Sequence, residues 1–494
     1  MSEALPVPVR AEDEKSKFTA SLGSDASLPV EHQHHIDPAL ERRIVRKCDL
    51  RVLPPILLLF MLSFLDRVNI GNAKIQGMAK DIDLRGTNYN VALLILFIPF
   101  ILLEIPSNLV MKKLRPSIWL SALLFGCGIM NMCMGFVQTY PQLVAVRFLL
   151  GIFEAGLGPG SIYLISMYYK RFELPKRLSW WYTSGIVAGA FGGLLAYAIS
   201  SGLNGARGYL AWRWIFIIEG LVTTVVAMAM PFLLVDWPHE AKFLNDEERA
   251  CLLARLSIDR AESAKMDRWN TKRVFSDWKI WIGTLMFFGI VNTNYATNFF
   301  IPSILVEMGY TAVRAQVMSI PIYAVAAVIC LSVCYISDKV RHRFGFVLLG
   351  VTVGSVGYII LLAQAGLPVG AKYFALFCLV GAGYIVQPIS VSWLMNNTGG
   401  HYKRAFASAA QIGWGNAGGI VASNIFLVKE APRYKTGYGV SLALLLMTGV
   451  MTVAMYFYLV AQNKKKASGQ RDHLLEGPDA DDLGDDDPRF KYNL

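Results

Sequence analysis

The sequence predicts an all-α integral membrane protein with 12 transmembrane helices in two six-helix halves. The chain has 494 residues, of which 54% are apolar, and its mean hydropathy is +0.42. A water-soluble domain, which must keep a charged surface, is less apolar than this. Apolar runs of roughly 20 residues, the length that crosses about 30 Å of hydrocarbon, recur along the chain. A long polar break divides these runs into two groups of six.

Residues 1–50 are polar and rich in proline and charge, so we expect a disordered cytosolic tail. His32, His34 and His35 lie together in it, but no further ligands stand nearby, and we expect no metal site. The first thirty residues lack the apolar core of a signal peptide. We therefore expect the first span to serve as its own insertion signal.

Two groups of apolar runs predict the helical bundles. The N-terminal six-helix bundle, residues 51–235, has runs near 51–72, 89–111, 117–138, 142–165, 179–203 and 213–235. The C-terminal six-helix bundle, residues 279–462, has runs near 279–306, 315–337, 344–366, 372–395, 404–428 and 437–461. Three of these stretches, 280–306, 373–400 and 405–428, contain no Asp, Glu, Lys or Arg, which favours membrane spans over soluble core helices.

Residues 236–278 form a basic cytosolic linker with an amphipathic pattern from Asp246 to Arg260. Residues 463–494 are basic and then acidic, and we expect a second disordered cytosolic tail. Lys and Arg are retained on the cytosolic side of a membrane, so alternate basic loops place both termini in the cytosol. These basic loops contain Arg42, Arg43, Arg46 and Lys47, then Lys112, Lys113 and Arg115, then Lys170, Arg171, Lys176 and Arg177, then Lys339, Arg341 and Arg343, and last Lys403 and Arg404.

The composition excludes several classes of function. Lys plus Arg exceed Asp plus Glu by 47 − 36 = 11, but the basic residues form short clusters between apolar runs, so we expect no nucleic-acid partner. The seven cysteines show no paired ligand spacing and are interpreted as reduced packing residues. The cytosolic segments contain no nucleophile motif, metal cluster or phosphate loop, so we expect neither an enzyme nor a cofactor.

Ionisable side chains at membrane depth are costly, and each is therefore a functional hypothesis. All of those predicted lie in the first half, at Asp66, Arg67, Glu104, Arg147, Glu154 and Glu219. Asp66 lies about fifteen residues into the first span and Glu154 about twelve into the fourth, which runs in the opposite direction. The two carboxylates can therefore approach each other near mid-membrane. Arg147 precedes Glu154 by seven residues and lies on the same helical face.

Two interpretations of these charges stay open on the residues alone. In the first, they form a structural network of ion pairs that locks spans 1 and 4 together. In the second, protonation of Asp66 or Glu154 frees Arg67 or Arg147 to hold an anion bidentately. The second interpretation couples the entry of a proton to the entry of an anion.

The second half has neutral polar side chains in three of its predicted spans. They either join helix to helix or face a cavity and recognise the uncharged part of a ligand. These residues are Asn292, Asn294 and Asn298, then Gln387, Ser390 and Trp393, and then Gln411, Asn416 and Asn424.

Four segments resemble the fungal allantoate permease group, which belongs to the anion:cation symporters of the major facilitator superfamily. The segments are Leu65 to Ala73 (LDRVNIGNA), Arg147 to Gly160 (RFLLGIFEAGLGPG), Trp212 to Gly220, and 236–249 (DWPHEAKFLNDEER). A later stretch around Trp393 and Asn416 extends the resemblance, which covers about residues 40–462. It implies the major facilitator fold and proton-coupled uptake of a small carboxylate nutrient of the allantoate, nicotinate or pantothenate type.

The resemblance also implies roles for individual residues. Proton coupling would fall to Asp66 and Glu154. Substrate binding would fall to Arg67, Arg147, Asn292, Ser390, Trp393 and Asn416, and gating to Glu104, Lys112, Asp338, Lys339 and Arg343. The chain departs from the superfamily at the loop between spans 2 and 3, where no Asp precedes Lys112, and at Phe100, where relatives often have Tyr. The implied partners are a small organic anion, protons and the lipid bilayer, with a monomer in the plasma membrane.

Two alternatives remain beside the symporter. A proton antiporter that exports a metabolite or toxin is disfavoured because span 5 contains glycines but lacks the Gly-Pro pair of the antiporter signature. A non-transporting nutrient receptor is disfavoured because both predicted tails are short.

Overall fold

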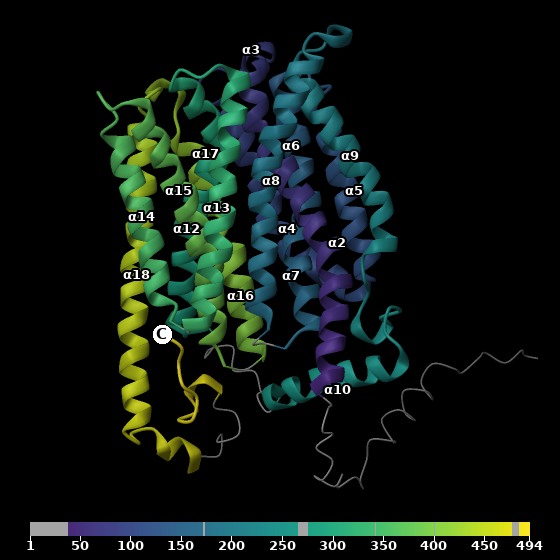
Figure 1. Cartoon of the computed structure of the whole chain (residues 1–494), viewed down its shortest axis with the longest axis vertical. Coiled ribbons are helices and arrows are strands. Elements are labelled where there is room, and N and C mark those ends of the chain that lie inside the picture. Colours follow the sequence, from purple (N-terminus) through teal and green to yellow (C-terminus); the bar gives the residue numbers. More distant parts are fainter. Residues whose placement is uncertain (1–37, 171–172, 265–274, 341, 400, 477–483) are drawn as a thin grey trace, which may run out of the picture.

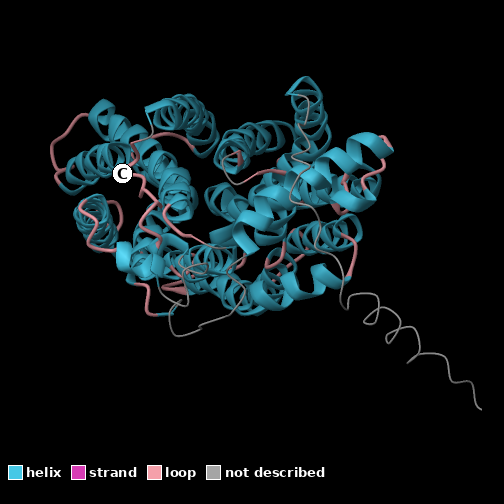
Figure 2. Ribbon diagram, turned by 90° about the horizontal axis from the view of Figure 1, so that it is seen from below, coloured by secondary structure: helices cyan, strands magenta, loops and turns pink. Residues whose placement is uncertain are grey.

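The computed structural model describes residues 38–170, 173–264, 275–340, 342–399, 401–476 and 484–494. The described residues form helices joined by short loops (Figure 1). Most of the long helices run roughly parallel to one another and are seen nearly end-on from below (Figure 2), whereas α10 (Asp246–Ala264) lies across one end of the bundle (Figure 1). The expected all-α fold is therefore confirmed. His32, His34 and His35 lie outside the described residues.

The first half consists of helices that end at residue 233. They are α2 (Pro38–Ala73), a π-helical turn (Lys74–Met78), α3 (Ala79–Asp81), α4 (Asn88–Lys113), α5 (Pro116–Met134), α6 (Tyr140–Glu154), α7 (Leu157–Tyr168), α8 (Leu174–Leu203) and α9 (Ala211–Leu233). Helices α6 and α7 together form the fourth expected span, which is interrupted at Ala155 and Gly156.

The second half repeats this plan after the linker helix α10 (Asp246–Ala264). Its helices are α12 (Trp278–Glu307), α13 (Ala312–Val340), α14 (Phe344–Leu362), α15 (Val369–Asn396), α16 (His401–Gly415), α17 (Gly418–Ile425) and α18 (Lys435–Ala467). Short 3-10 turns cover Ala206–Gly208, Pro238–Glu240, Val428–Glu430, Asp472–Glu476 and Gly484–Asp486.

Ten helical segments of the described chain are long and apolar enough to cross a membrane. The two expected spans outside this set are α12 and the α16–α17 pair. Helix α12 has 30 residues, but its Asn and Thr side chains lower its hydropathy. The α16–α17 pair is interrupted at Asn416 and Ala417, so neither piece is long enough alone. All twelve expected spans are thus present as helical segments.

The ends of the chain differ from expectation. Residues 38–50, which we expected in a disordered tail, form the first turns of α2. Helix α18 continues to Ala467, and residues 484–494 pack against the second half, where Asp485 is 1% exposed and Tyr492 2% exposed. The acidic residues of this segment have lysine partners, which composition alone does not reveal.

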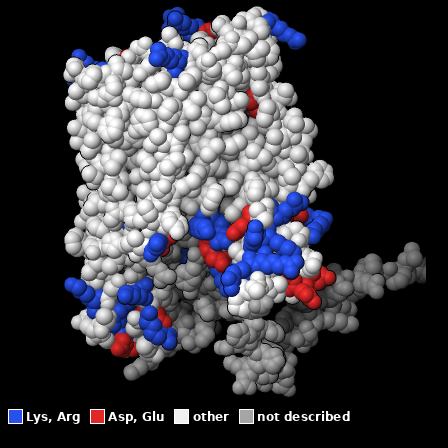
Figure 3. All heavy atoms as spheres, viewed as in Figure 1, with Lys and Arg blue, Asp and Glu red and all other residues white. Residues whose placement is uncertain are grey.

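The face shown in Figure 3 has few charged side chains between its two ends. One end contains α10 and the other contains α3 (Figure 1); we call them the α10 end and the α3 end. At the α10 end, ion pairs attach α10 to the start of α2 and to the α7–α8 loop. Arg255 contacts Glu41 at 2.7 Å and also Glu173, and Lys47 contacts Glu248 at 2.5 Å.

The two halves are in contact along several pairs of helices. Helix α8 packs against α13, α2 against α12, and α4 against α17. At the α3 end, Asn90 of α4 donates to the backbone carbonyls of Ser423 at 2.6 Å and Phe426 at 3.1 Å. Gly71 of α2 lies so close to α12 that an added Cβ would be 2.8 Å from the carbonyl oxygen of Phe299. A side chain at position 71 would separate the halves there.

We expect Gly71→Ala to destabilise the folded protein by about 1–3 kcal/mol, because a methyl group is forced against a backbone oxygen that cannot move alone. Gly202→Ala is the control, since nothing lies within 4 Å of a Cβ at that position. Thermal unfolding of the purified protein in detergent should show a lower midpoint for the first variant alone. Equal midpoints would contradict the close approach.

Candidate functional site

A small cavity of about 70 Å³ lies between the two halves at mid-depth. Arg67 is the single Asp, Glu, Lys or Arg among its described lining residues. The polar lining from the second half is Asn294, Tyr295, Asn298, Tyr384, Gln387 and Asn416. The aromatic lining from the first half is Phe60, Phe64, Phe100, Trp181 and Tyr182. The cavity thus combines one cation with neutral polar groups and aromatic walls.

Arg67 of α2 joins the two halves through its guanidinium. Its Nε donates to Glu154 Oε2 at 2.6 Å, and its Nη1 donates to the Tyr295 hydroxyl of α12 at 2.5 Å. Its Cζ also lies 4.6 Å from the centre of the Phe100 ring. The side chains of Arg67 and Glu154 are only 7% and 0% exposed. Buried charges need such pairing, because an isolated charge in a low-dielectric interior is strongly unfavourable.

Glu154 is positioned by the interruption between α6 and α7. It is the last residue of α6, and α7 starts again at Leu157. Gly156 in the interruption lies against α4, where an added Cβ would be 1.9 Å from Ser107 Oγ. The glycine lets the two helices approach here, so the carboxylate can reach Arg67 on α2. Its second oxygen, Oε1, has no hydrogen-bond partner among the described residues.

Asp66, the neighbour of Arg67, lies in a separate polar cluster. Successive residues of a helix point about 100° apart, and Asp66 Oδ1 accepts from Asn131 at 2.6 Å and from Thr223 at 3.3 Å. Asp66 Oδ2 has no described partner. Glu219 lies one turn before Thr223 on α9, is 2% exposed, and has no described partner for either oxygen. Its charge would interact with that of Asp66.

Arg147 does not line the cavity. It is 0% exposed. Its Nε donates to the Ala92 carbonyl of α4 at 3.2 Å and its Nη1 donates to the Arg67 carbonyl of α2 at 3.4 Å. It therefore supports the backbone that carries Arg67. Arg147 and Glu154 lie on the same face of α6, as predicted, but neither is among the described lining residues of the cavity.

The structure separates the four residues of the second half that we assigned to substrate binding. Asn416 lines the cavity at the interruption between α16 and α17. Asn292 donates to Ser441 of α18 at 3.0 Å, and Ser390 donates to the Gln387 carbonyl at 2.9 Å. Trp393 lies at the α10 end, where its Nε1 donates to the Asn493 carbonyl at 2.9 Å. The last three are outside the lining of the cavity.

The residues assigned to gating lie apart from one another. Glu104 of α4 is 4% exposed and faces Gly413 of α16 across the two halves, where an added Cβ would be 3.5 Å from Glu104 Oε2. Asp338, in the last turn of α13, forms an ion pair at 2.8 Å with Arg343, which directly precedes α14. Lys112 and Lys339 are both exposed, and Lys112 Nζ lies 5.6 Å from the Tyr163 ring centre.

Tyr295 and Tyr384 are cavity residues that we did not predict. The signal for Tyr295 was the helical period, because Val291, Asn294, Tyr295 and Asn298 repeat every three or four residues and all line the cavity. Asn292 is one position off this face and contacts α18 instead. The partners of Asp66, Asn131 and Thr223, are ordinary polar residues in apolar runs, and their sequence gave no signal.

Comparisons with known proteins agree with this architecture. The profile of the Major Facilitator Superfamily matches residues 56–423. The MFS-type transporter cnsO of Penicillium expansum is 34% identical over 100% of this chain and 99% of its own length. The high-affinity nicotinic acid transporter of Saccharomyces cerevisiae is 32% identical over 98% of this chain and 91% of its own.

A solved structure with the same fold is that of a bacterial homologue of the human lysosomal transporter Spinster, in an inward-facing and occupied conformation. It superposes with a TM-score of 0.59 and 16% sequence identity, over 82% of this chain and 95% of that chain. Because the identity is low, this likeness concerns the fold alone.

The two buried glutamates should respond differently to amide substitution. Glu154→Gln removes the charge that pairs with Arg67, and we expect it to destabilise the protein by about 1.5–3 kcal/mol, the value of a hydrogen bond to a charged group. Glu219→Gln removes a carboxylate without a described partner, next to Asp66, so the unfolding midpoint should stay the same or rise. Thermal unfolding in detergent measures both. A larger loss for Glu219→Gln would contradict this view of the cluster.

Proposed function

The chain belongs to the major facilitator superfamily, and from this premise we propose that it is a proton-coupled symporter that imports a small organic anion by alternating access. The supporting observation is the position of Arg67. It is the cation of the described cavity lining, and its charge is matched by a single carboxylate, Glu154. An anionic substrate and a proton can therefore replace the Arg67–Glu154 ion pair together.

The substrate step follows from the chemistry of the guanidinium. Arg67 remains charged at any physiological pH, and its planar group binds a carboxylate through two parallel hydrogen bonds. In the structure, Nε is occupied by Glu154 and Nη1 by Tyr295. A substrate carboxylate can take the place of Glu154 on Arg67. The hydrogen bond from Arg67 Nη1 to the Tyr295 hydroxyl can stay in place meanwhile.

The proton step concerns Glu154. When Glu154 takes up a proton, it no longer holds Arg67 as an ion pair, and the guanidinium becomes available to the anion. One proton and one monovalent anion add no net charge to the cavity. This balance matters because each charge moved into a negative-inside cell works against about 2.3 kcal/mol per 100 mV.

The other lining residues suggest the kind of anion. Asn294, Asn298 and Gln387 offer amide donors and acceptors for neutral polar atoms, and Phe100 and Trp181 offer flat apolar walls. Such a cavity suits a small, flat carboxylate. The similarity to a nicotinic acid transporter supports this class, since nicotinic acid is an aromatic carboxylate.

Alternating access requires that the halves separate at one end while they close at the other. The hydrogen bonds from Asn90 to Ser423 and Phe426 close the α3 end in this state. We take the α10 end as cytosolic because the basic loops and the linker gather there, as the positive-inside rule expects. The described state would then be closed to the outside, and the plasma membrane is the proposed location.

The first test is uptake of labelled small carboxylates, nicotinate among them, into cells that lack their own carriers. We expect wild-type accumulation to be greater at acidic than at near-neutral external pH. Glu154→Gln should abolish this accumulation, because it cannot take up the coupling proton, while counterflow exchange of the same anion continues.

Counterflow exchange is also the control for folding, since a misfolded variant would lose both activities. Efflux of anion from preloaded wild-type cells, without any uptake, would overturn the symporter and favour a proton antiporter that exports its substrate. Saturable binding of the anion with no flux in either direction would favour a receptor.

Tyr295→Phe tests the contact between Arg67 and the second half. Loss of the hydroxyl removes a hydrogen bond to a charged group, worth about 1.5–3 kcal/mol, so we expect the KM for the anion to rise about tenfold or more. Tyr373→Phe is the control, because the Tyr373 hydroxyl donates to the Met318 carbonyl at 2.7 Å and does not line the cavity. Equal KM values for the two variants would remove Tyr295 from the site.

A further inference from the structure

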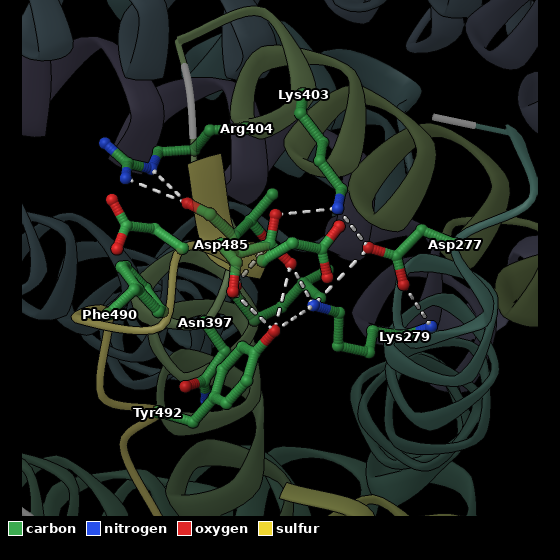
Figure 4. A network of polar contacts seen from close by, with 12 residues as sticks. Asp277, Lys279, Asn397, Lys403, Arg404, Asp485, Phe490 and Tyr492 are labelled. Carbon is green, nitrogen blue, oxygen red and sulfur yellow. Dashed lines mark hydrogen bonds and ion pairs between the residues drawn. The ribbon is translucent and has the colours of Figure 1, made fainter. Parts of the chain in front are cut away.

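Residues 484–494, here called the end segment, lie in a socket at the α10 end of the second half (Figure 4). Asp485 is the centre of the contact. Its carboxylate forms ion pairs with Lys279 of α12 and with Lys403 of α16, the latter at 2.7 Å. The side chains of Lys279, Lys403 and Asp485 are only 4%, 5% and 2% exposed. This is a desolvated charge cluster, unlike an exposed surface ion pair.

A third lysine binds the backbone of the same segment. Lys466 Nζ, near the end of α18, donates to the carbonyl oxygens of Asp485 at 2.6 Å, Asp487 at 3.0 Å and Phe490 at 3.0 Å. All three hydrogens of the ammonium group are therefore used on the peptide. The socket thus binds both the Asp485 carboxylate and the backbone carbonyls of the end segment.

Two asparagines bind the backbone in the manner of a paired strand. Asn463 Nδ2 donates to the Tyr492 carbonyl at 3.0 Å, and the Tyr492 backbone N–H donates to Asn463 Oδ1 at 2.9 Å. Asn397 makes the same two bonds to Asn493, at 2.9 Å and 2.7 Å. Each amide thus satisfies both backbone groups of one residue, as a neighbouring strand would.

Aromatic contacts complete the socket. The Tyr492 ring is 4.2 Å from Lys466 Nζ and 4.7 Å from Lys279 Nζ, measured to the ring centre. Its hydroxyl donates to the Asp485 carbonyl at 2.7 Å. Tyr492 is 2% exposed, so both the ring and its polar tip are enclosed. A lysine over the face of an aromatic ring is attracted by the ring's negative face, more strongly when the pair is desolvated.

The socket is built from the ends of four helices of the second half. Lys279 starts α12, Asn397 follows α15, Lys403 starts α16, and Lys466 ends α18. Gly399 lies under the segment, where an added Cβ would be 2.2 Å from the Asp485 nitrogen. The contacts of Asp485, Tyr492 and Asn493 given above are with these helices, so the end segment holds their ends together.

The buried ammonium groups of the socket need a negatively charged or carbonyl-bearing partner. Without Asp485, the buried Lys279 and Lys403 would share Asp277, which contacts Lys403 at 2.5 Å and Lys279 at 3.5 Å, and Lys466 would have lost its carbonyl ligands. Buried ammonium groups in excess over carboxylates are strongly unfavourable. An empty socket would therefore attract another acidic peptide.

We propose that this socket is a peptide-binding site for an acidic and aromatic segment, that residues 484–494 are its resident ligand, and that their binding holds the α10 ends of α12, α15, α16 and α18 together. The proposal does not depend on which anion the cavity binds or on proton coupling. It adds a second, separate binding site to the chain.

The site should be insensitive to mild acid. Burial raises the pKa of Asp485, but the charges of Lys279 and Lys403 outweigh burial and hold it at about 2, below the usual 3.8. A carboxyl with a lowered pKa contributes its full stabilisation above its unfolded value and loses it only as the pH falls through the folded value. Burial lowers the pKa of Lys466 to about 8, so this lysine stays fully charged only well below that pH. Socket binding should therefore be equal at pH about 5 and about 6.5, unlike acid-stimulated uptake.

The test uses a chain that ends at residue 483 and a fluorescent peptide with the sequence of residues 484–494, mixed in detergent and followed by fluorescence anisotropy. We expect saturable binding to the shortened chain, and binding at least about tenfold weaker to the full chain, whose socket is occupied. In the peptide, Asp485→Asn should weaken binding about tenfold or more, because two ion pairs to buried lysines are lost.

Asp487→Asn in the peptide is the matched control, since the Asp487 carboxylate pairs with Arg489 of the same segment, at 2.7 Å. The affinity of this peptide should change less than about twofold, because the pair lies within the peptide and Arg489 is exposed. No binding of the unaltered peptide to a folded shortened chain, or equal losses for the two altered peptides, would overturn the proposal.

If the chain that ends at residue 483 aggregates, a full-length variant provides the test instead. Full-length Asp485→Asn keeps every other contact but holds its own segment more weakly, so it should bind the unaltered peptide more tightly than the wild-type full chain does. Equal peptide binding by both full-length chains would also overturn the proposal.

Discussion

The fold depends on how a few charges are accommodated at membrane depth. A charge far from water needs a partner of opposite sign or a set of oriented dipoles. Three side chains of the first half meet this need in different ways: Arg67 pairs with Glu154, Arg147 donates to backbone carbonyls, and Asp66 accepts from Asn131 and Thr223. Each solution links different helices, so the charges also determine how the first half is packed.

In this arrangement Arg67 is one of the residues through which the two halves are in contact. Its partner in the second half is Tyr295 of α12, a helix whose Asn294, Tyr295 and Asn298 side chains face the cavity. The interruption between α6 and α7 lies in the first half, and that between α16 and α17 lies in the second. Backbone irregularity is tolerated in a membrane only where protein or a cavity covers it, which is where both interruptions lie.

Much of the fold could be predicted from the sequence because hydrophobic length is a local property. The twelve runs agree with the helices to within a few residues at most ends, for example 89–111 with Asn88–Lys113. The ends of the chain could not be predicted in this way. The order of residues 484–494 depends on Lys279, Lys403 and Lys466, which are distant in sequence and become neighbours only after the helices pack.

The candidate site was also predictable only in part. The buried ionisable residues were identified because charge in an apolar run is rare, and Arg67 and Glu154 do lie together. Among neutral residues this signal is absent, so Trp393 and Asn292 were selected by chemical type although they face the end segment and α18. Asn292 lies on a different face of α12 from Asn294, Tyr295 and Asn298. The sequence alone does not tell which of these faces lies against the cavity.

The two halves of the cavity also differ in how freely they can change over evolutionary time. On the side of the first half, replacing Arg67 or Glu154 leaves an unmatched charge in the interior, so a single change there costs stability unless the partner also changes. On the side of the second half, Asn298, Gln387 and Asn416 are neutral, and exchanging one for another polar residue leaves the sum of buried charges unaltered. A lineage can therefore acquire a new cargo by successive single substitutions in one half while the other is inherited intact.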